Sequence, residues 1–175
     1  KRGCLCCTSN IYKKMIFKKK IKTFKDEQNH ISVIENFSNL KFFTNIIKNI
    51  EYFVFFGTLL GLTRNNNLIE NDDDIDFYVN IKERNNLIKI LKDHAINVDL
   101  ELKVNKNKSF LQIKNKINNK DAIVDFYFYE DDLDEHHLIE KWNFEGGTHI
   151  PSKHLRIPKI FTHPIQKREI NSVSI

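Results

Sequence analysis

The chain has 175 residues, of which 41% are hydrophobic and 14 are Phe, so it is long and apolar enough for one domain with a substantial core and is unlike a disordered chain. No apolar run approaches the ~20 residues that a membrane-spanning helix needs. The net charge of +5 is uneven, because residues 1–25 hold nine Lys or Arg and no acid, which leaves 19 basic and 23 acidic residues in the remainder. This acidic remainder excludes a basic nucleic-acid-binding face on the main body, so no nucleic-acid partner is expected for it.

Residues 1–29 are predicted to form a basic, loosely held arm. Such an arm is typically solvated, and its alternative use is peripheral contact with an anionic membrane or with RNA through residues 1–25. The three cysteines Cys4, Cys6 and Cys7 lie in this arm without the spacing of a zinc site, and are interpreted as free thiols, with acylation as the alternative. Because the body has no cysteine, a reducing, cytoplasmic location is expected, with membrane association through the arm as a variant.

The first half of the body predicts a helix, a strand, a turn and a second strand. Residues 31–50 repeat apolar positions at spacings of three and four, which indicates an amphipathic helix. Residues 52–56 form an aromatic and β-branched run that ends at a glycine, as a buried strand entering a turn does. Residues 58–71 then predict a helix-like turn with an Asn-rich loop, and residues 74–81 a second strand.

The second half predicts one helix and several strands. Helical spacing returns over residues 82–94, and residues 98–104 alternate strictly between apolar and polar, as in a half-exposed strand. Residues 110–113 predict its partner, and residues 122–129 another strong strand. Residues 146–164 are expected to be irregular because Gly and Pro interrupt them. The order of elements predicts an α+β fold, a small mixed sheet flanked by helices on one side.

Three acids in the predicted strands are the candidate metal ligands. Asp74 and Asp76 lie two residues apart on one strand, so their side chains share a face that the intervening Ile75 does not. Two such carboxylates repel each other, and Mg²⁺ or Mn²⁺ removes that repulsion. Asp125 lies within the later strand and is expected to complete the site, with a second role as the base for an acceptor hydroxyl.

The run from Phe55 to Gly61 supplies the second half of the candidate site. Gly57 and Thr58 follow the first predicted strand, and a glycine there lets the backbone approach a phosphate closely. Acids at Asp72, Asp74, Asp76 and Glu83 also match positions 1, 3, 5 and 12 of a calcium-binding EF-hand loop, but Phe77 stands where that loop needs glycine. We therefore interpret these acids as part of a strand-borne metal site, with Asp72 and Asp73 shaping the loop that precedes it.

Together these motifs resemble the signature of the LicD family, which belongs to the nucleotidyltransferase-fold superfamily and includes phosphocholine transferases and fukutin-type transferases. The resemblance covers roughly residues 50–130 and implies a LicD-like nucleotidyltransferase-fold domain at residues 30–175. It assigns the catalytic and metal-binding acids to Asp74, Asp76 and Asp125, and donor or phosphate binding to Gly57, Thr58 and Arg64. Arg64 matches the family's Arg, which either binds a donor phosphate or pairs with the acidic loop.

Two departures from the family pattern bear on the substrates. Glu70-Asn71 stands where the family usually has Pro-Trp, and Asn65-Asn66-Asn67 replaces a small glycine-containing turn. These changes leave the three acids in place. They lie beside the site, however, so the identity of the donor and of the acceptor is not assigned by the resemblance. Lys153, His154 and Arg156 are interpreted as scattered surface charge, with phosphate contact as the alternative.

The resemblance implies a Mg²⁺-dependent transferase that passes a phospho-alcohol from a CDP-linked donor, of the CDP-choline or CDP-polyol type, to a hydroxyl of a surface glycan. Lipopolysaccharide or capsule biosynthesis is the implied context. One alternative is a nucleotidyltransferase that moves NMP from NTP to a small molecule or a protein. Another is a non-catalytic relative that acts as a scaffold or binding module.

Overall fold

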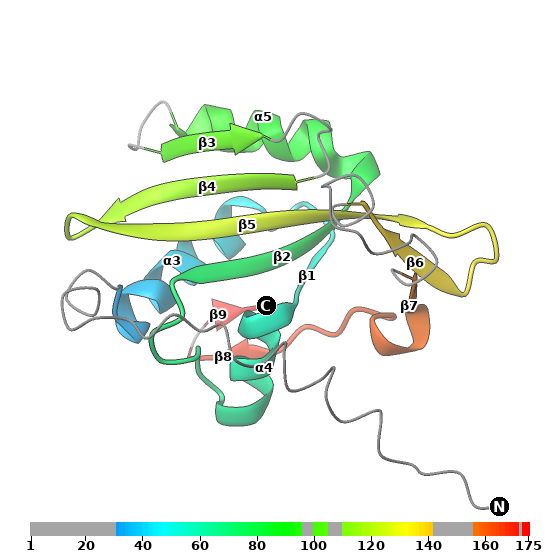
Figure 1. Cartoon of the computed structure of the whole chain (residues 1–175), viewed down its shortest axis with the longest axis horizontal. Helices are drawn as coiled ribbons and strands as arrows, with labels where there is room; N and C mark the ends of the chain where they lie inside the picture. Colours follow the sequence, from blue (N-terminus) through cyan, green and yellow to red (C-terminus); the bar gives the residue numbers. More distant parts are fainter. Residues whose placement is uncertain (1–30, 96–99, 105–109, 142–155, 172) are drawn as a thin grey trace, which may run out of the picture. The chain divides into compact units, whose positions relative to one another are not determined.

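A computed structural model describes residues 31–95, 100–104, 110–141, 156–171 and 173–175 (Figure 1). The predicted arm at residues 1–29, with its three cysteines, lies outside the described residues, as do Lys153 and His154. Residues Ile31–Ile175 form one compact unit. Within the described residues, no helix combines the length and the hydrophobicity needed to cross a membrane.

The first helix, α3 (Val33–Ile46), begins at a well-formed cap. The Ser32 hydroxyl accepts a hydrogen bond from the Glu35 backbone N–H, and the Glu35 carboxylate accepts one from the Ser32 backbone N–H. Asn118, from the turn between two later strands, donates to the same carboxylate at 2.6 Å. The helix ends four residues before the predicted end at Ile50, whose side chain is nevertheless buried in the core.

The remaining elements follow the predicted order, and the described residues add two 3₁₀ turns and four short strands. They are β1 (Tyr52–Val54), α4 (Phe56–Asn65), β2 (Asp74–Asn80), the 3₁₀ turn η1 (Ile81–Glu83), α5 (Arg84–Ala95), β3 (Leu100–Val104), β4 (Phe110–Ile117), β5 (Lys120–Asp131), β6 (His137–Glu140), β7 (Arg156–Pro158), the 3₁₀ turn η3 (Lys159–Phe161), β8 (Glu169–Ile170) and β9 (Val173–Ser174). The expectation that residues 146–164 are wholly irregular is wrong, because β7 lies within them and pairs with β6. β6 and β7 are four and three residues long, and their sequences lack the alternation of apolar and polar residues by which a strand is predicted.

The main sheet has the order β1-β2-β5-β4-β3, with β6 paired to the end of β5 and β7 paired to β6. β2 and β5 run parallel, whereas the other pairs in the sheet are antiparallel. The predicted α+β class with a mixed sheet is therefore confirmed. The parallel pair lies at the centre of the sheet, where Asp76 has as its neighbour Asp125, which lies 49 positions later in the chain.

The two faces of this central pair differ. On one face Ile75, Phe77 and Phe126 are fully buried in the main core, which also contains Phe43 of α3 and Leu87 of α5. The helices α3 and α5 thus cover one face, as predicted. The third helix, α4, differs from these two, because its N-terminal end contacts β2 at Asp76.

Candidate active site

The structure brings the three predicted acids together. Asp76 of β2 lies directly opposite Asp125 of β5 in the parallel register, and Asp74 is two residues before Asp76 on the same face. One carboxylate oxygen from each residue lies within 4.8 Å of the others. Ile75 points into the core between the two acids of β2, as the alternation predicts. The geometry thus gathers on two strands the donor set that the sequence predicts for a metal.

Burial sets the electrostatics of the cluster. Asp76 is 4% exposed and Asp125 is 6% exposed. Burial, and then repulsion from neighbouring carboxylates, raises the pKa of Asp74 and of Asp76 to about 7. Burial also raises the pKa of Asp125 to about 6, although hydrogen bonds from Gln112 and Tyr127 oppose this increase. Asp76 and Asp125 are buried and Asp74 is half-buried, and the described residues place no basic partner among them. Such a group of carboxylates fits a hard divalent cation that prefers oxygen ligands.

Thr58, in the first turn of α4, fixes Asp76. The Thr58 side chain is buried, and its hydroxyl accepts a hydrogen bond from the Asp76 backbone N–H at 2.9 Å. The Thr58 backbone N–H in turn donates to the Asp76 carboxylate, which opposes the rise in its pKa. The structure therefore places Thr58 within the predicted site and assigns its hydroxyl to Asp76. Its role toward a donor phosphate stays a prediction.

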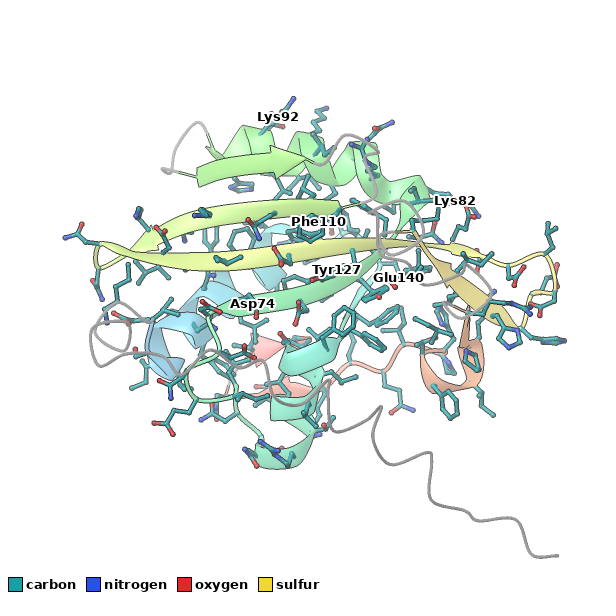
Figure 2. The ribbon with its side chains drawn as sticks, in the orientation of Figure 1. Asp74, Lys82, Lys92, Phe110, Tyr127 and Glu140 are labelled. Atoms are coloured by element: carbon teal, nitrogen blue, oxygen red, sulfur yellow. The ribbon has the colours of Figure 1, made fainter. Side chains whose placement is uncertain are left out.

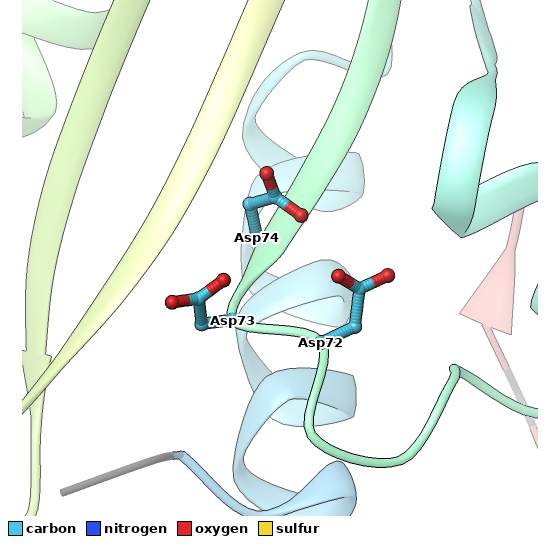
Figure 3. Close-up of side chains that lie close together, drawn as sticks. All are labelled: Asp72, Asp73 and Asp74. Carbon is cyan, nitrogen blue, oxygen red and sulfur yellow. The ribbon is translucent and has the colours of Figure 1, made fainter. Parts of the chain in front are cut away.

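Gly57 is the point at which the acidic loop approaches α4. A Cβ atom at this position would lie 2.5 Å from Oδ2 of Asp72, so a larger residue would displace that carboxylate. The side chains of Asp72, Asp73 and Asp74 fan out from the loop that precedes β2 (Figure 3), and they too bring carboxylate oxygens within 4.8 Å of one another. Asp72 thus does more than shape the loop, because its charge also raises the pKa of Asp74.

The predicted glycine-rich turn is a direct junction between β1 and α4. β1 ends at Val54, two residues before the predicted end at Phe56, and the helix begins at Phe56 with φ = 44°. A bulky residue rarely adopts this left-handed conformation. Phe56 is 44% exposed, and its ring packs edge-on against Tyr127, with the ring centroids 5.1 Å apart. The junction therefore presents an aromatic ring beside the acids.

Two arginines considered as phosphate contacts from the sequence alone, Arg64 and Arg156, lie apart from the three acids. Arg64 lies in the last turn of α4, about 10 Å along the helix from Gly57, and within the described residues it pairs with none of the acids. Its role in donor binding stays a prediction. Arg156 forms ion pairs with Asp132 and Asp134 near the β5–β6 turn, which agrees with the interpretation as surface charge.

Several side chains of the site are not identifiable from the sequence. Gln112 of β4 donates from Nε2 to Oδ1 of Asp125 at 3.0 Å. Asn36 of α3 is buried and donates to the backbone carbonyls of Asp72 at 3.2 Å and Asp74 at 3.4 Å. A Gln between two core residues of a strand does indicate the opposite face, but only the register shows which residue it meets.

Aromatic side chains extend the same face beyond the acids. Tyr127, two residues after Asp125, lies between Asp74 and Glu140 in Figure 2. Its ring stacks on Tyr78 and also contacts Phe110, with centroids 5.6 Å and 5.2 Å apart. Glu140 is buried, and Tyr78 hydrogen-bonds to it. The site is therefore a group of carboxylates with an aromatic wall at one end.

A mixed sheet that presents three carboxylates from neighbouring strands beside a helix N-terminus defines a domain of the nucleotidyltransferase type. A family model described as LicD/FKTN/FKRP, nucleotidyltransferase domain, matches residues 49–175. The chain belongs to this family, which places it among transferases as a class. A search of curated proteins gives no significant match.

Proposed function

We propose that this protein is a divalent-cation-dependent transferase that moves a phospho-alcohol, of the phosphocholine or phosphopolyol type, from a CDP-linked donor to a hydroxyl of a surface glycan. The observation that carries the proposal is the convergence of Asp74, Asp76 and Asp125 beside the first turn of α4. Membership of the LicD/FKTN/FKRP family supports the transferase class and, through it, this choice of chemistry.

The three acids would hold Mg²⁺ or Mn²⁺, since all their donor atoms are carboxylate oxygens. Such a cation, when bound, polarises the phosphorus under attack and stabilises the departing phosphate oxygen. The raised pKa values of the acids support this assignment, because a cation relieves the repulsion that raises them.

The protein's own groups would bind the donor and accept a proton. The N-terminal N–H groups of α4 favour an anion. A donor phosphate would approach the backbone at Gly57 closely once the Asp72 carboxylate, which lies beside Gly57, rotates away. Asp125, which Gln112 and Tyr127 orient by hydrogen bonds, would take the proton of the acceptor hydroxyl. The acceptor oxygen then bonds to the phosphorus that carries the alcohol, and the bond to CMP breaks, with CMP keeping its electron pair.

Nucleotide release tests the proposal. The protein is incubated with Mg²⁺ and a panel of NTPs and CDP-alcohols, each with a glycan acceptor, and the products are analysed by mass spectrometry. Release of CMP from a CDP-alcohol supports the proposal. Pyrophosphate release from an NTP indicates a nucleotidyltransferase instead, and no release from any donor favours a scaffold or binding module.

A matched pair of variants ties any activity to the site. Asp76→Asn keeps the shape of the side chain but removes one predicted ligand, and we expect it to reduce turnover by about 10²-fold or more. Asp93→Asn makes the same change at an exposed position of α5, and is expected to leave turnover unchanged. Calorimetric titration of Mg²⁺ into both variants should show weakened binding for Asp76→Asn alone.

A further inference from the structure

The Asp125 carboxylate is held by two neutral side chains of its own sheet. Gln112 and Asp125 are direct partners in the antiparallel register of β4 and β5, so both side chains lie on the same face. The Gln112 amide donates to Oδ1 of Asp125 at 3.0 Å. The Tyr127 hydroxyl provides a second hydrogen bond to the same carboxylate. Both donors come from rigid strands, so the carboxylate has little freedom to rotate.

The other two acids lack this arrangement among the described residues. Asp76 is held by the backbone N–H of Thr58, and its neighbour Asp74 hydrogen-bonds to the side chain of Asp72, which is itself an acid. Asp125 alone receives its hydrogen bonds from an amide and a phenol side chain. This difference gives Asp125 the most defined orientation of the three.

The residue type at position 112 suits this purpose. A Lys or Arg there would also bind the carboxylate, but its positive charge would repel a cation in the same site. A Gln amide donates a hydrogen bond without adding charge, so the full negative charge of Asp125 remains available. Neutral partners of this kind orient the ligands of metal sites and raise metal affinity by about 10- to 100-fold.

We propose that Gln112 is a positioning residue for the cation site: by fixing the Asp125 carboxylate it strengthens the binding of a divalent cation. The proposal rests on the proposed function in one respect, the use of the three acids as metal ligands. It adds a residue that neither the family signature nor the sequence pattern assigns.

Calorimetric titration with MnCl₂ alone tests the proposal without requiring turnover. Gln112→Met is close to Gln in shape and has no donor, and we expect its dissociation constant for Mn²⁺ to rise about 10-fold or more. Tyr127→Phe keeps the ring and removes the second hydrogen bond, and is expected to weaken binding about threefold. Gln166→Met is the control, since it makes the same neutral change at an exposed position outside the acid-bearing strands.

The stoichiometry of the titration separates positioning from a general loss of structure. A looser sheet reduces the fraction of protein that binds Mn²⁺, whereas a misplaced ligand changes the dissociation constant at full stoichiometry. A dissociation constant within twofold of the wild type for Gln112→Met overturns the proposal, whatever Tyr127→Phe shows. If Gln112→Met does not fold, Gln112→Asn replaces it, because this side chain keeps an amide but is one carbon too short to reach Oδ1 of Asp125 in the same way, and the same twofold limit applies. Absence of Mn²⁺ binding by the wild type overturns the metal site of the proposed function instead.

Discussion

Side chains along β2 and β5 alternate between two faces with opposite chemistry. On one face, Phe77 and Phe126 stack with their centroids 5.2 Å apart and are fully buried beneath α3 and α5. On the other, Asp76 and Asp125 lie side by side, buried but without a positive partner among the described residues of the cluster. The same two strands therefore carry apolar residues that stabilise the fold and buried carboxylates whose repulsion lowers its stability. We therefore expect substitutions on the apolar face to change mainly stability, and substitutions on the acid-bearing face to change mainly the proposed activity.

The sharpest way to test this separation is to change neighbouring residues of β5. Phe126→Ala removes a fully buried ring that also contacts Phe43, and we expect the free energy of unfolding to fall by about 3–5 kcal/mol. Tyr127→Phe, one residue later on the other face, should cost about 1 kcal/mol. Chemical denaturation of both variants measures the difference. Similar losses at the two positions would contradict the separation.

The two glycines of α4 allow the same test within one helix. A Cβ at Gly61 would lie 2.7 Å from the Asn67 carbonyl oxygen and 3.0 Å from the Ile69 backbone nitrogen, so Gly61→Ala is expected to destabilise the fold by about 1–3 kcal/mol. A Cβ at Gly57 meets only the side chain of Asp72, which can rotate away. Gly57→Ala should therefore change the unfolding free energy by less than about 1 kcal/mol.

Activity is expected to show the reverse order for the two glycines. By moving Asp72 and crowding the expected phosphate position, Gly57→Ala should reduce turnover about 10²-fold. Gly61→Ala should retain most of its turnover per folded molecule. Thermal unfolding and the nucleotide-release assay, run on the same preparations, provide the comparison. Equal effects of the two substitutions on both measurements would contradict the expectation that Gly61 matters for stability and Gly57 for turnover.

The pH dependence of stability isolates the acid face. Burial and mutual repulsion raise the pKa of Asp74 and Asp76 to about 7 in the folded state, while unfolded Asp titrates near ~4. The folded protein then binds more protons than the unfolded chain between about pH 4 and pH 7. Without metal, the free energy of unfolding should therefore fall as the pH rises through this window, lowering the unfolding temperature by about 10 °C or more.

Differential scanning calorimetry in the presence of EDTA measures this decline. Asp76→Asn should make the decline shallower, since it removes one of the three carboxyls with a raised pKa (Asp125, at about 6, is the third) and reduces the repulsion on Asp74. Addition of Mg²⁺ should stabilise the wild type more at pH 8 than at pH 5. Glu35, whose pKa is lowered to about 2 by hydrogen bonds from Asn118 and Ser32, titrates below the window. An identical slope in Asp76→Asn would exclude the acid cluster as its origin.

The smallest expected effect concerns the cap of α3 on the core face. Ser32→Ala removes the hydroxyl that accepts from the Glu35 backbone N–H, and should cost about 1 kcal/mol. Because this cap lies on the face opposite the acids, the dissociation constant for Mn²⁺ should stay within twofold of the wild type. A larger change in that constant would show that a shift of α3 also displaces the acids, through the hydrogen bonds from Asn36 to the backbone of Asp72 and Asp74.

How much of this site was predictable varies residue by residue. The alternation around Asp74, Ile75 and Asp76 placed two acids on one face, and the structure agrees. The strand around Asp125 was predictable for the same local reason. Gln112 was not, because its partner is set by the pairing of β4 with β5. Nor was the approach of Asp72 to Gly57, which depends on how the loop before β2 folds back toward α4.

The sequence by itself determined the α+β class, the facing direction of each acid and, through the motif, the family. These follow from patterns a few residues long, since a strand alternates its side chains and a helix repeats every 3.6 residues. Only the tertiary structure decided that β2 runs parallel to β5 with Asp76 opposite Asp125, and that Gln112 and Thr58 hold these acids in place. Register joins residues far apart in the chain, and it is fixed by packing of the buried face, which no local pattern specifies.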